Sequence, residues 1–123
     1  MGKKGKAESL VTAVNTAEAV GSGSLEVFAT PMLAALMENA ATKALDLADD
    51  QTSVGTYLEI RHLAATPVGL KVWVEAELIE AEGRRLVFNI EAFDEKEKIG
   101  EARHNRVIVG TDRFMTKTNS KLS

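Results

Sequence analysis

The sequence predicts an α+β fold in which a curved antiparallel sheet wraps around one long helix. Helical periodicity is sustained over a single long stretch, 27–50, whereas the chain after Thr52 consists of runs in which apolar and polar residues alternate. Short turns join these runs, which is typical of an antiparallel meander. Because one face of each predicted strand is apolar, we expect the helix to cover that face.

The composition is that of one globular domain, which we expect to span residues 1–123. Hydrophobic residues make up 45% of the chain, which is ordinary for a globular protein. The net charge of −3 does not favour nucleic-acid binding. No apolar run approaches the roughly 20 residues that span a bilayer, and no apolar segment follows the basic N-terminus as in a secretory signal. We therefore expect a cytoplasmic protein without nucleic-acid or membrane partners.

The first part of the chain carries weaker signals. Residues 1–7, MGKKGKA, are predicted to be a disordered tail because lysines and glycines in this pattern hold no structure of their own. The β-prone run SLVTAV, in 9–19, predicts a first short strand. The segment GSGS at 21–24 has the composition of a flexible connector.

The long helix has a clear start signal. Thr30 is a natural N-cap, and Pro31 would then occupy the first helical position, where its missing N–H is not needed. Apolar residues recur at three- and four-residue spacing from Met32 to Leu45, which predicts a broad apolar face. The cluster DDQTS at 49–53 is expected to end the helix.

Four strands are predicted after the helix, at 53–63, 70–80, 85–93 and 99–109. In the second of these, Val72, Val74 and Ala76 share one face, and the turns between strands are short. A curved sheet of this kind around a single helix is the hot-dog architecture. Apolar residues on the opposite face, such as Trp73, favour a homodimer over the alternative of isolated surface residues.

Three polar residues on these elements are candidates for chemistry. Glu38 lies at the border of the apolar face of the helix, where a solvated glutamate is the common explanation. His62 has the same parity as Leu58 and Ile60 and so faces the helix, although a lone inward histidine is more often a core residue. Thr30 is most simply an N-cap. These residues alone leave the function open.

Several classes of site are excluded by the residue pattern. The two histidines, His62 and His104, fall on different predicted strands without metal-ligand spacing. The chain has no glycine-rich phosphate-binding loop and no G-x-S-x-G nucleophile elbow, and without cysteine it has no thiolate chemistry. We therefore expect neither a metal nor a cofactor.

Three segments together resemble the fluoroacetyl-CoA thioesterase family of hot-dog proteins. They are VFATPMLAALMENAA at 27–41, VGTYLEIRHLAATPVGLKVWVEAEL at 54–78 and AEGRRLVFNIEAFDEKEKIGEARHNRVIV at 81–109. The similarity runs from about residue 27 to residue 114, and it keeps the order of the motifs and nearly all spacings.

The resemblance implies three catalytic residues. The family's catalytic threonine follows a V-F-A run, as Thr30 does here. Its glutamate comes eight residues later in an L-M-E triplet, which corresponds to Glu38, and its histidine precedes an A-A-T-P segment, as His62 does. Whether Glu38 acts as nucleophile, base or orienting group stays open.

Substrate-binding residues are implied in the same way. Gly55, seven residues before His62, corresponds to a glycine that lines the thioester site, and Phe28 belongs to the V-F-A run. The family's H-x-R pair corresponds to His104 and Arg106, and Arg106 is the expected substrate contact.

The implied activity is hydrolysis of a short-chain acyl-CoA to free acid and CoA, without a cofactor, by a homodimer with its site at the subunit interface. Thr30 and Glu38 would lie about 12 Å apart in one ideal helix. Either Thr30 therefore sits on a loop that folds back, or the site combines residues from two subunits.

One segment departs from the family pattern. The specialised fluoroacetyl-CoA enzyme carries an aromatic, proline-containing lid before its V-F-A-T run, whereas residues 20–26 here read VGSGSLE. The resemblance therefore implies a general or differently selective thioesterase. Two alternatives stay open: another hot-dog activity such as enoyl-CoA hydration, and a non-catalytic acyl-CoA-binding module, which would have no need to keep Thr30, Glu38 and His62.

Overall fold

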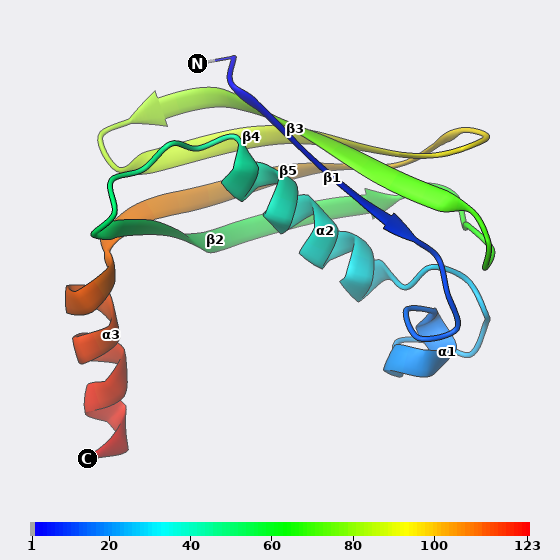
Figure 1. Cartoon of the computed structure of the whole chain (residues 1–123), viewed down its shortest axis with the longest axis horizontal. Coiled ribbons are helices and arrows are strands. Elements are labelled where there is room, and N and C mark those ends of the chain that lie inside the picture. Colours follow the sequence, from blue (N-terminus) through cyan, green and yellow to red (C-terminus); the bar gives the residue numbers. More distant parts are fainter. Residues whose placement is uncertain (1) are drawn as a thin grey trace.

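A five-stranded antiparallel sheet curves around helix α2 (Figure 1). The computed structural model describes residues 2–123. Its elements follow in chain order: β1 Lys4–Leu10, α1 Ala17–Val20, α2 Thr30–Lys43, β2 Gln51–His62, β3 Lys71–Glu82, β4 Arg85–Asp94, β5 Lys98–Gly110, α3 Thr111–Asn119 and a 3-10 turn, Ser120–Leu122.

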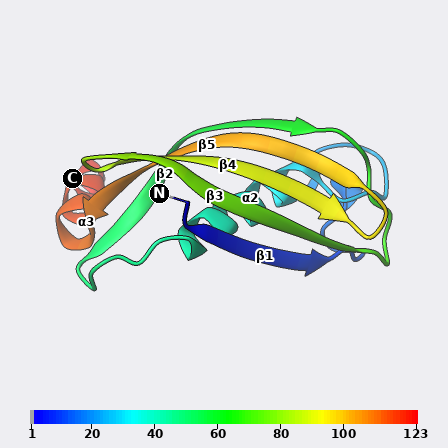
Figure 2. The same cartoon turned by 90° about the horizontal axis from the view of Figure 1, so that it is seen from above.

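The strands lie in the order β1-β3-β4-β5-β2, with every neighbouring pair antiparallel. Strands β3, β4 and β5 form a meander, but the predicted succession is wrong for β2, which pairs with β5 and not with β3. The two strands that flank α2 in the sequence, β1 and β2, become the two edges of the sheet (Figure 2). The sequence-based prediction of an α+β, hot-dog fold is confirmed.

The core lies between α2 and the concave face of the sheet. Leu33 and Met37 of α2 are fully buried, and they pack with the inward side chains that alternate along β3 and β4. The alternation predicted for these strands is confirmed by the buried residues Val72, Val74, Ala76 and Leu78 in β3 and Leu86, Phe88, Ile90 and Ala92 in β4. The other face carries charged residues together with the stacked rings of Trp73 and Phe93, and the helix covers only the apolar face.

The prediction of a disordered tail at residues 1–7 is wrong from Lys4 onward. Strand β1 begins there and pairs with β3, and Met1 lies outside the described residues. Gly5 and Ala7 are buried against α2, whereas Lys4 and Lys6 are exposed. The inward residues are small because the helix backbone comes close: a Cβ at Gly5 would collide with the carbonyl oxygen of Ala40. The strand predicted within 9–19 is also wrong in its bounds, since β1 ends at Leu10, where the chain turns.

Both ends of the predicted long helix need correction. The helix starts at Thr30, but the N-cap residue is Ala29, and the Thr30 side chain makes no capping hydrogen bond. The helix ends at Lys43 with Ala44 as its C-cap, although the favourable alanine and leucine residues continue beyond it. Two further helices were not predicted: the short α1 and, after β5, α3, which projects from the sheet with no buried residue (Figure 1).

A bulge in β2 sets which of its side chains face α2. The pairing of β2 with β5 shifts register between Gly55 and Tyr57. Beyond this point Leu58, Ile60 and His62 alternate with exposed residues and are half-buried. An extra residue at a bulge exchanges the two faces of a strand, so Gly55 and His62 both face inward despite their odd spacing.

The close approach of β1 to α2 predicts a destabilising Gly5→Ala substitution. The added methyl group would push β1 from Ala40, which we expect to lower the free energy of unfolding by about 1–3 kcal/mol, as overpacking does elsewhere. Lys4→Ala, at an exposed position of the same strand, should change it by less than about 0.5 kcal/mol. Urea unfolding of both variants measures the difference, and equal stabilities would mean that β1 does not pack on the helix.

Candidate functional site

The start of α2 meets the end of β2 at a hydrogen bond between two predicted site residues. The Thr30 hydroxyl oxygen, Oγ1, lies 2.7 Å from Nδ1 of His62. Thr30 is the first residue of the helix and His62 is the last residue of the strand. A hydroxyl that does not cap its own helix is therefore free to bind the imidazole.

An extended segment at 27–29 positions Thr30. The Phe28 amide donates to the carbonyl oxygen of Thr66 at 2.9 Å, and the Ala29 amide donates to that of Asn15 at 3.0 Å. Phe28 and Ala29 are buried, so apolar packing and hydrogen bonds together fix this approach to the helix. Phe28, which the resemblance implied as a substrate contact, places most of its side chain in the core, although it also borders the cavity at this site.

A cavity of about 300 Å³ opens at the Thr30–His62 pair. The other residues that line it are mostly small or apolar: Ala17, Ser22, Val27, Phe28, Leu63, Ala64 and Ala65. A space of this size and character suits a small organic group, and the two polar side chains are placed to act on it.

The environment of His62 favours the neutral form of its imidazole. Burial lowers the pKa of its imidazole from the ordinary value of 6.5, because the charged form loses hydration. Its second ring nitrogen, Nε2, is buried and has no hydrogen-bond partner among the described residues. If the Thr30 hydroxyl donates to Nδ1, the proton of the neutral ring is on Nε2, which then lacks an acceptor.

Glu38 belongs to a second group of polar residues, two turns further along α2. Its carboxylate oxygen Oε2 lies 3.8 Å from Nη1 of Arg106, and its side chain is about half exposed. A Cβ at Gly55 would come within 2.9 Å of the same carboxylate oxygen, so glycine leaves the carboxylate its room. The structure thus brings Glu38, Gly55 and Arg106 together, while the assignment of Gly55 to a thioester site stays a prediction.

The guanidinium of Arg106 is held by buried partners. Its Nε–H donates to the Ser53 hydroxyl at 2.8 Å, and an Nη2–H donates to the Ser53 carbonyl oxygen at 2.9 Å. Nη1 lies 3.1 Å from Nε2 of His104, whose Nδ1 lies 2.8 Å from the carbonyl oxygen of Tyr57. These contacts fit one tautomer of His104, in which Nδ1–H donates to Tyr57 and Nε2 accepts from Arg106.

Ser53 was not predicted as a member of a site, and His104 was recognised only as part of the H-x-R pair, without a role of its own. His104 is fully buried, and its burial lowers the pKa of the imidazole, which matches a neutral ring that accepts from Arg106. The H-x-R spacing was the available signal for His104, because residues two apart on a strand share a face. Ser53 gave no signal, since the contact spans 53 positions of the sequence.

The two groups lie apart within one chain. Thr30 and Glu38 both belong to α2, so about 12 Å of helix separates their Cα atoms, and the alternative of a loop at Thr30 is not what the structure has. Gly55 and His62 are seven residues apart on β2, or about 23 Å at the usual rise of a strand. Within residues 2–123, no hydrogen bond or ion pair joins Glu38 to His62.

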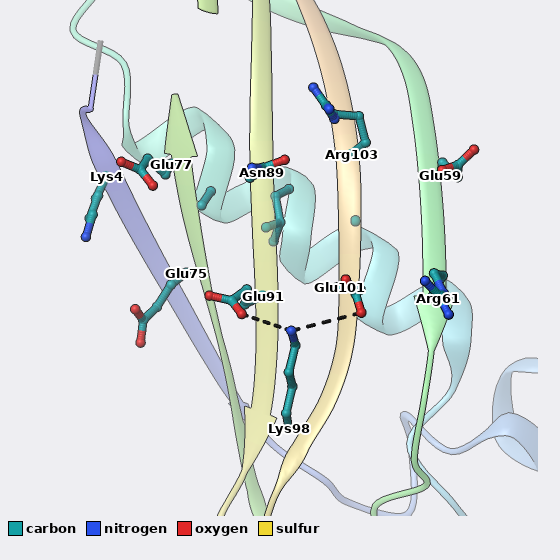
Figure 3. Close-up of a pocket in the computed structure, with 13 residues that line it drawn as sticks. Lys4, Glu59, Arg61, Glu75, Glu77, Asn89, Glu91, Lys98, Glu101 and Arg103 are labelled. Carbon is teal, nitrogen blue, oxygen red and sulfur yellow. Dashed lines mark ion pairs between the residues drawn. The ribbon is translucent and has the colours of Figure 1, made fainter. Parts of the chain in front are cut away.

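A larger hollow, of about 410 Å³, lies on the opposite face of the sheet from α2 (Figure 3). Charged side chains from all five strands line it, and Lys98 reaches between Glu91 at 2.9 Å and Glu101 at 4.0 Å. Glu91 and Glu101 are cross-strand neighbours, so Lys98 offsets their repulsion. None of the predicted site residues borders this hollow, which has the features of a solvated sheet face.

The described part of the chain holds neither a metal-binding cluster nor a helix that could cross a membrane. Residues 2–123 contain no group of three histidine, aspartate or glutamate side chains that could hold a metal ion. The helices described here are all too short or too polar to cross a membrane.

Known proteins resemble this chain in sequence over most of its length. The family model described as "Fluoroacetyl-CoA-specific thioesterase" matches residues 11–112. A fluoroacetyl-CoA thioesterase from Streptantibioticus cattleyicolor is 41% identical over 98 residues, which cover 78% of this chain and 70% of the relative.

Solved structures agree with the sequence comparison. A structure of the fluoroacetyl-CoA thioesterase FlK matches with a TM-score of 0.91 at 33% identity, covering 98% of this chain and 96% of that one. A thioesterase superfamily member from Thermus thermophilus matches with a TM-score of 0.89 at 29% identity, covering 97% and 90%. The resemblance seen in the sequence is confirmed, and the chain belongs to the fluoroacetyl-CoA-specific thioesterase family of hot-dog proteins.

Proposed function

We propose that this chain hydrolyses a short-chain acyl-CoA to the free acid and CoA, with Thr30, Glu38 and His62 as its catalytic residues. The observation that carries the proposal is the 2.7 Å contact between Thr30 and the neutral imidazole of His62 beside a small cavity. The relatives that match most of the chain are named as thioesterases, which supports the same reaction.

Thioester cleavage needs a proton carrier and stabilisation of the oxyanion. His62, neutral at pH 7, can accept a proton from water or from the Thr30 hydroxyl and later deliver it to the departing CoA thiolate. Thr30 is at the N-terminus of α2, where the helix dipole favours the negative charge that develops on the carbonyl oxygen. Glu38 would either orient His62, activate water or attack the carbonyl.

Glu38 can join the other two residues if two copies of the chain share the site. Strand β2 is a free edge of the sheet. Antiparallel pairing of two β2 edges about a twofold axis would bring the His62 end of one strand toward the Gly55 end of the other. Glu38 of one subunit would then approach the Thr30–His62 pair of its partner. We therefore propose a homodimer whose two sites are each built from both subunits.

The segment before Phe28 bears on the choice of acyl group. Val20 and Leu25 are exposed apolar residues, and the chain between them contains no aromatic side chain that could close over the cavity. An open cavity of about 300 Å³ places few restrictions on a small acyl group. The proposed substrates are therefore several short-chain acyl-CoAs, without strong preference for a fluorinated one.

The reaction itself is tested by incubating the protein with a panel of short acyl-CoAs and a thiol-reactive dye. We expect release of free CoA, and His62→Ala should slow it by about 10²–10⁴-fold because the general base is lost. Glu75→Gln, at an exposed carboxylate of the inner strand β3 on the opposite face of the sheet, is the matched control and should leave the rate unchanged. Binding of acyl-CoA without CoA release would instead identify a non-catalytic module.

The pH dependence of kcat/KM follows from the environment of His62. Its pKa is lowered by burial, so the free base predominates above a midpoint that lies below 6.5. We expect kcat/KM to rise with pH through that midpoint and to be level by neutral pH, since protonation disables the base. A rising limb centred above 6.5 would contradict the assignment of His62 as the base.

Subunit sharing of the site is tested by mixing two inactive variants, Glu38→Gln and His62→Ala, after joint unfolding and refolding. A mixed dimer would contain one site with both substitutions and one intact site. Random mixing should therefore restore about a quarter of the wild-type activity. No recovery from correctly refolded dimers would show that each site lies within one chain.

A further inference from the structure

A buried polar pair lies outside the proposed catalytic residues. Thr66 is fully buried and Asp94 is 5% exposed, and the Thr66 hydroxyl donates to Oδ2 of Asp94 at 2.8 Å. The other carboxylate oxygen, Oδ1, accepts from the amides of Lys96 at 2.8 Å and Glu97 at 3.0 Å. Burying a carboxylate is costly unless its oxygens are hydrogen-bonded. The three hydrogen bonds that the Asp94 carboxylate accepts offset this cost and hold the side chain in one position.

Thr66 is connected to both partners of the Thr30–His62 contact. It follows His62 by four residues along the chain, and its carbonyl oxygen accepts from the amide of Phe28, two residues before Thr30. Two further hydrogen bonds, from the amides of Leu63 and Ala64, tie the intervening segment to the Ile99 carbonyl oxygen, at 2.7 and 3.3 Å. The backbone around Thr66 therefore contacts both the segment that carries the Thr30 hydroxyl and the segment that carries the His62 imidazole.

Asp94 anchors this junction to the sheet. It is the last residue of β4, and its carboxylate closes the turn into β5 by binding two amides of that turn. Burial alone would raise the pKa of its carboxyl group, but the hydrogen bonds from Lys96, Thr66 and Glu97 hold it below the ordinary value of 3.8. The carboxylate is thus charged at neutral pH, and a charged acceptor makes the bond from Thr66 a strong one.

We propose that Thr66 and Asp94 are positioning residues that fix the hydrogen bond between Thr30 and His62. Neither residue borders the cavity, whereas Ala64 and Ala65 do, so the pair acts through the backbone that it holds. The kinetic consequence rests on the proposed thioesterase function. A shift of about 1 Å in reacting groups can cost about 10²-fold in rate, so a loosened junction should lower turnover without any contact to substrate.

Two substitutions at Thr66 separate positioning from a general loss of stability. Thr66→Val removes the hydroxyl at nearly constant volume and leaves the turn capped by Asp94. Thr66→Ser keeps the hydroxyl and is the matched control. At a temperature well below the unfolding of each variant, we expect Thr66→Val to lower kcat by about 10–100-fold with little change in KM, and Thr66→Ser to stay close to wild type.

The second readout is the ¹⁵N NMR spectrum of the imidazole rings, which does not depend on hydrolysis. The chain has two histidines, so His104 serves as an internal reference. We expect Thr66→Val to shift the Nδ1 signal of His62, because its bond to Thr30 is weakened, while the His104 signals stay in place and Thr66→Ser resembles wild type. If wild-type protein released no CoA, the proposed function would fail, while this spectrum would still test the positioning role.

Three results would overturn the inference: unchanged His62 signals in Thr66→Val, a wild-type kcat in that variant, or equal losses in the valine and serine variants. Should Thr66→Val not fold, Asp94→Asn tests the same bond. Asparagine keeps an acceptor for the turn amides but replaces the charged acceptor of the Thr66 hydroxyl. It should produce a smaller change of the same kind in the His62 signal, and no change would overturn the proposal.

Discussion

The contact between the first residue of α2 and the last residue of β2 joins the start of the helix to an edge of the sheet. Because the chain leaves α2 and returns along β2, this contact closes a loop of 33 residues, from Thr30 to His62. The extended segment at 27–29, bound on both sides by backbone hydrogen bonds, can hold only one approach to the helix. The helix register, and with it the place of Glu38, depends on that approach.

The polar groups around Thr30 and around Glu38 have opposite electrostatic requirements. His62 lies at an apolar cavity that favours an uncharged imidazole. Glu38 lies opposite a guanidinium that is itself fixed by Ser53 and His104. About 12 Å of helix separates Thr30 from Glu38, so one chain can hold a neutral imidazole and a carboxylate beside a cation without either disturbing the other. In the proposed homodimer, pairing of two subunits would bring the two groups together.

Features of the fold that depend on neighbouring residues could be predicted from the sequence, whereas contacts between residues far apart in the chain could not. The alternation in β3 and β4 reports burial directly, and His62 was placed correctly because the count started at Leu58, beyond the bulge. Thr30 was interpreted as an N-cap because local propensity contains no information about its hydrogen bond with His62, which lies 32 positions away. Strand β1 was missed because its inward residues, Gly5 and Ala7, are small and carry no hydrophobic signal.

The same limit applies to the rest of the site. Residues after Lys43 favour helix locally, but tertiary packing ends it there, as it often overrides propensity. Thr66 and Asp94 each look like ordinary turn residues, and only the fold shows that they meet. Ser53 and Arg106 are likewise joined across the sequence by strand pairing.

The free edges of the sheet also determine how far self-association could go. An exposed strand is a template to which further chains can add, and unlimited addition would produce fibres. If two β2 edges pair about a twofold axis, that edge is consumed in both copies, and growth could continue only through β1. This strand has seven residues and exposes Lys4 and Lys6, features by which natural sheets discourage further pairing. Polymerisation would thus terminate at two chains.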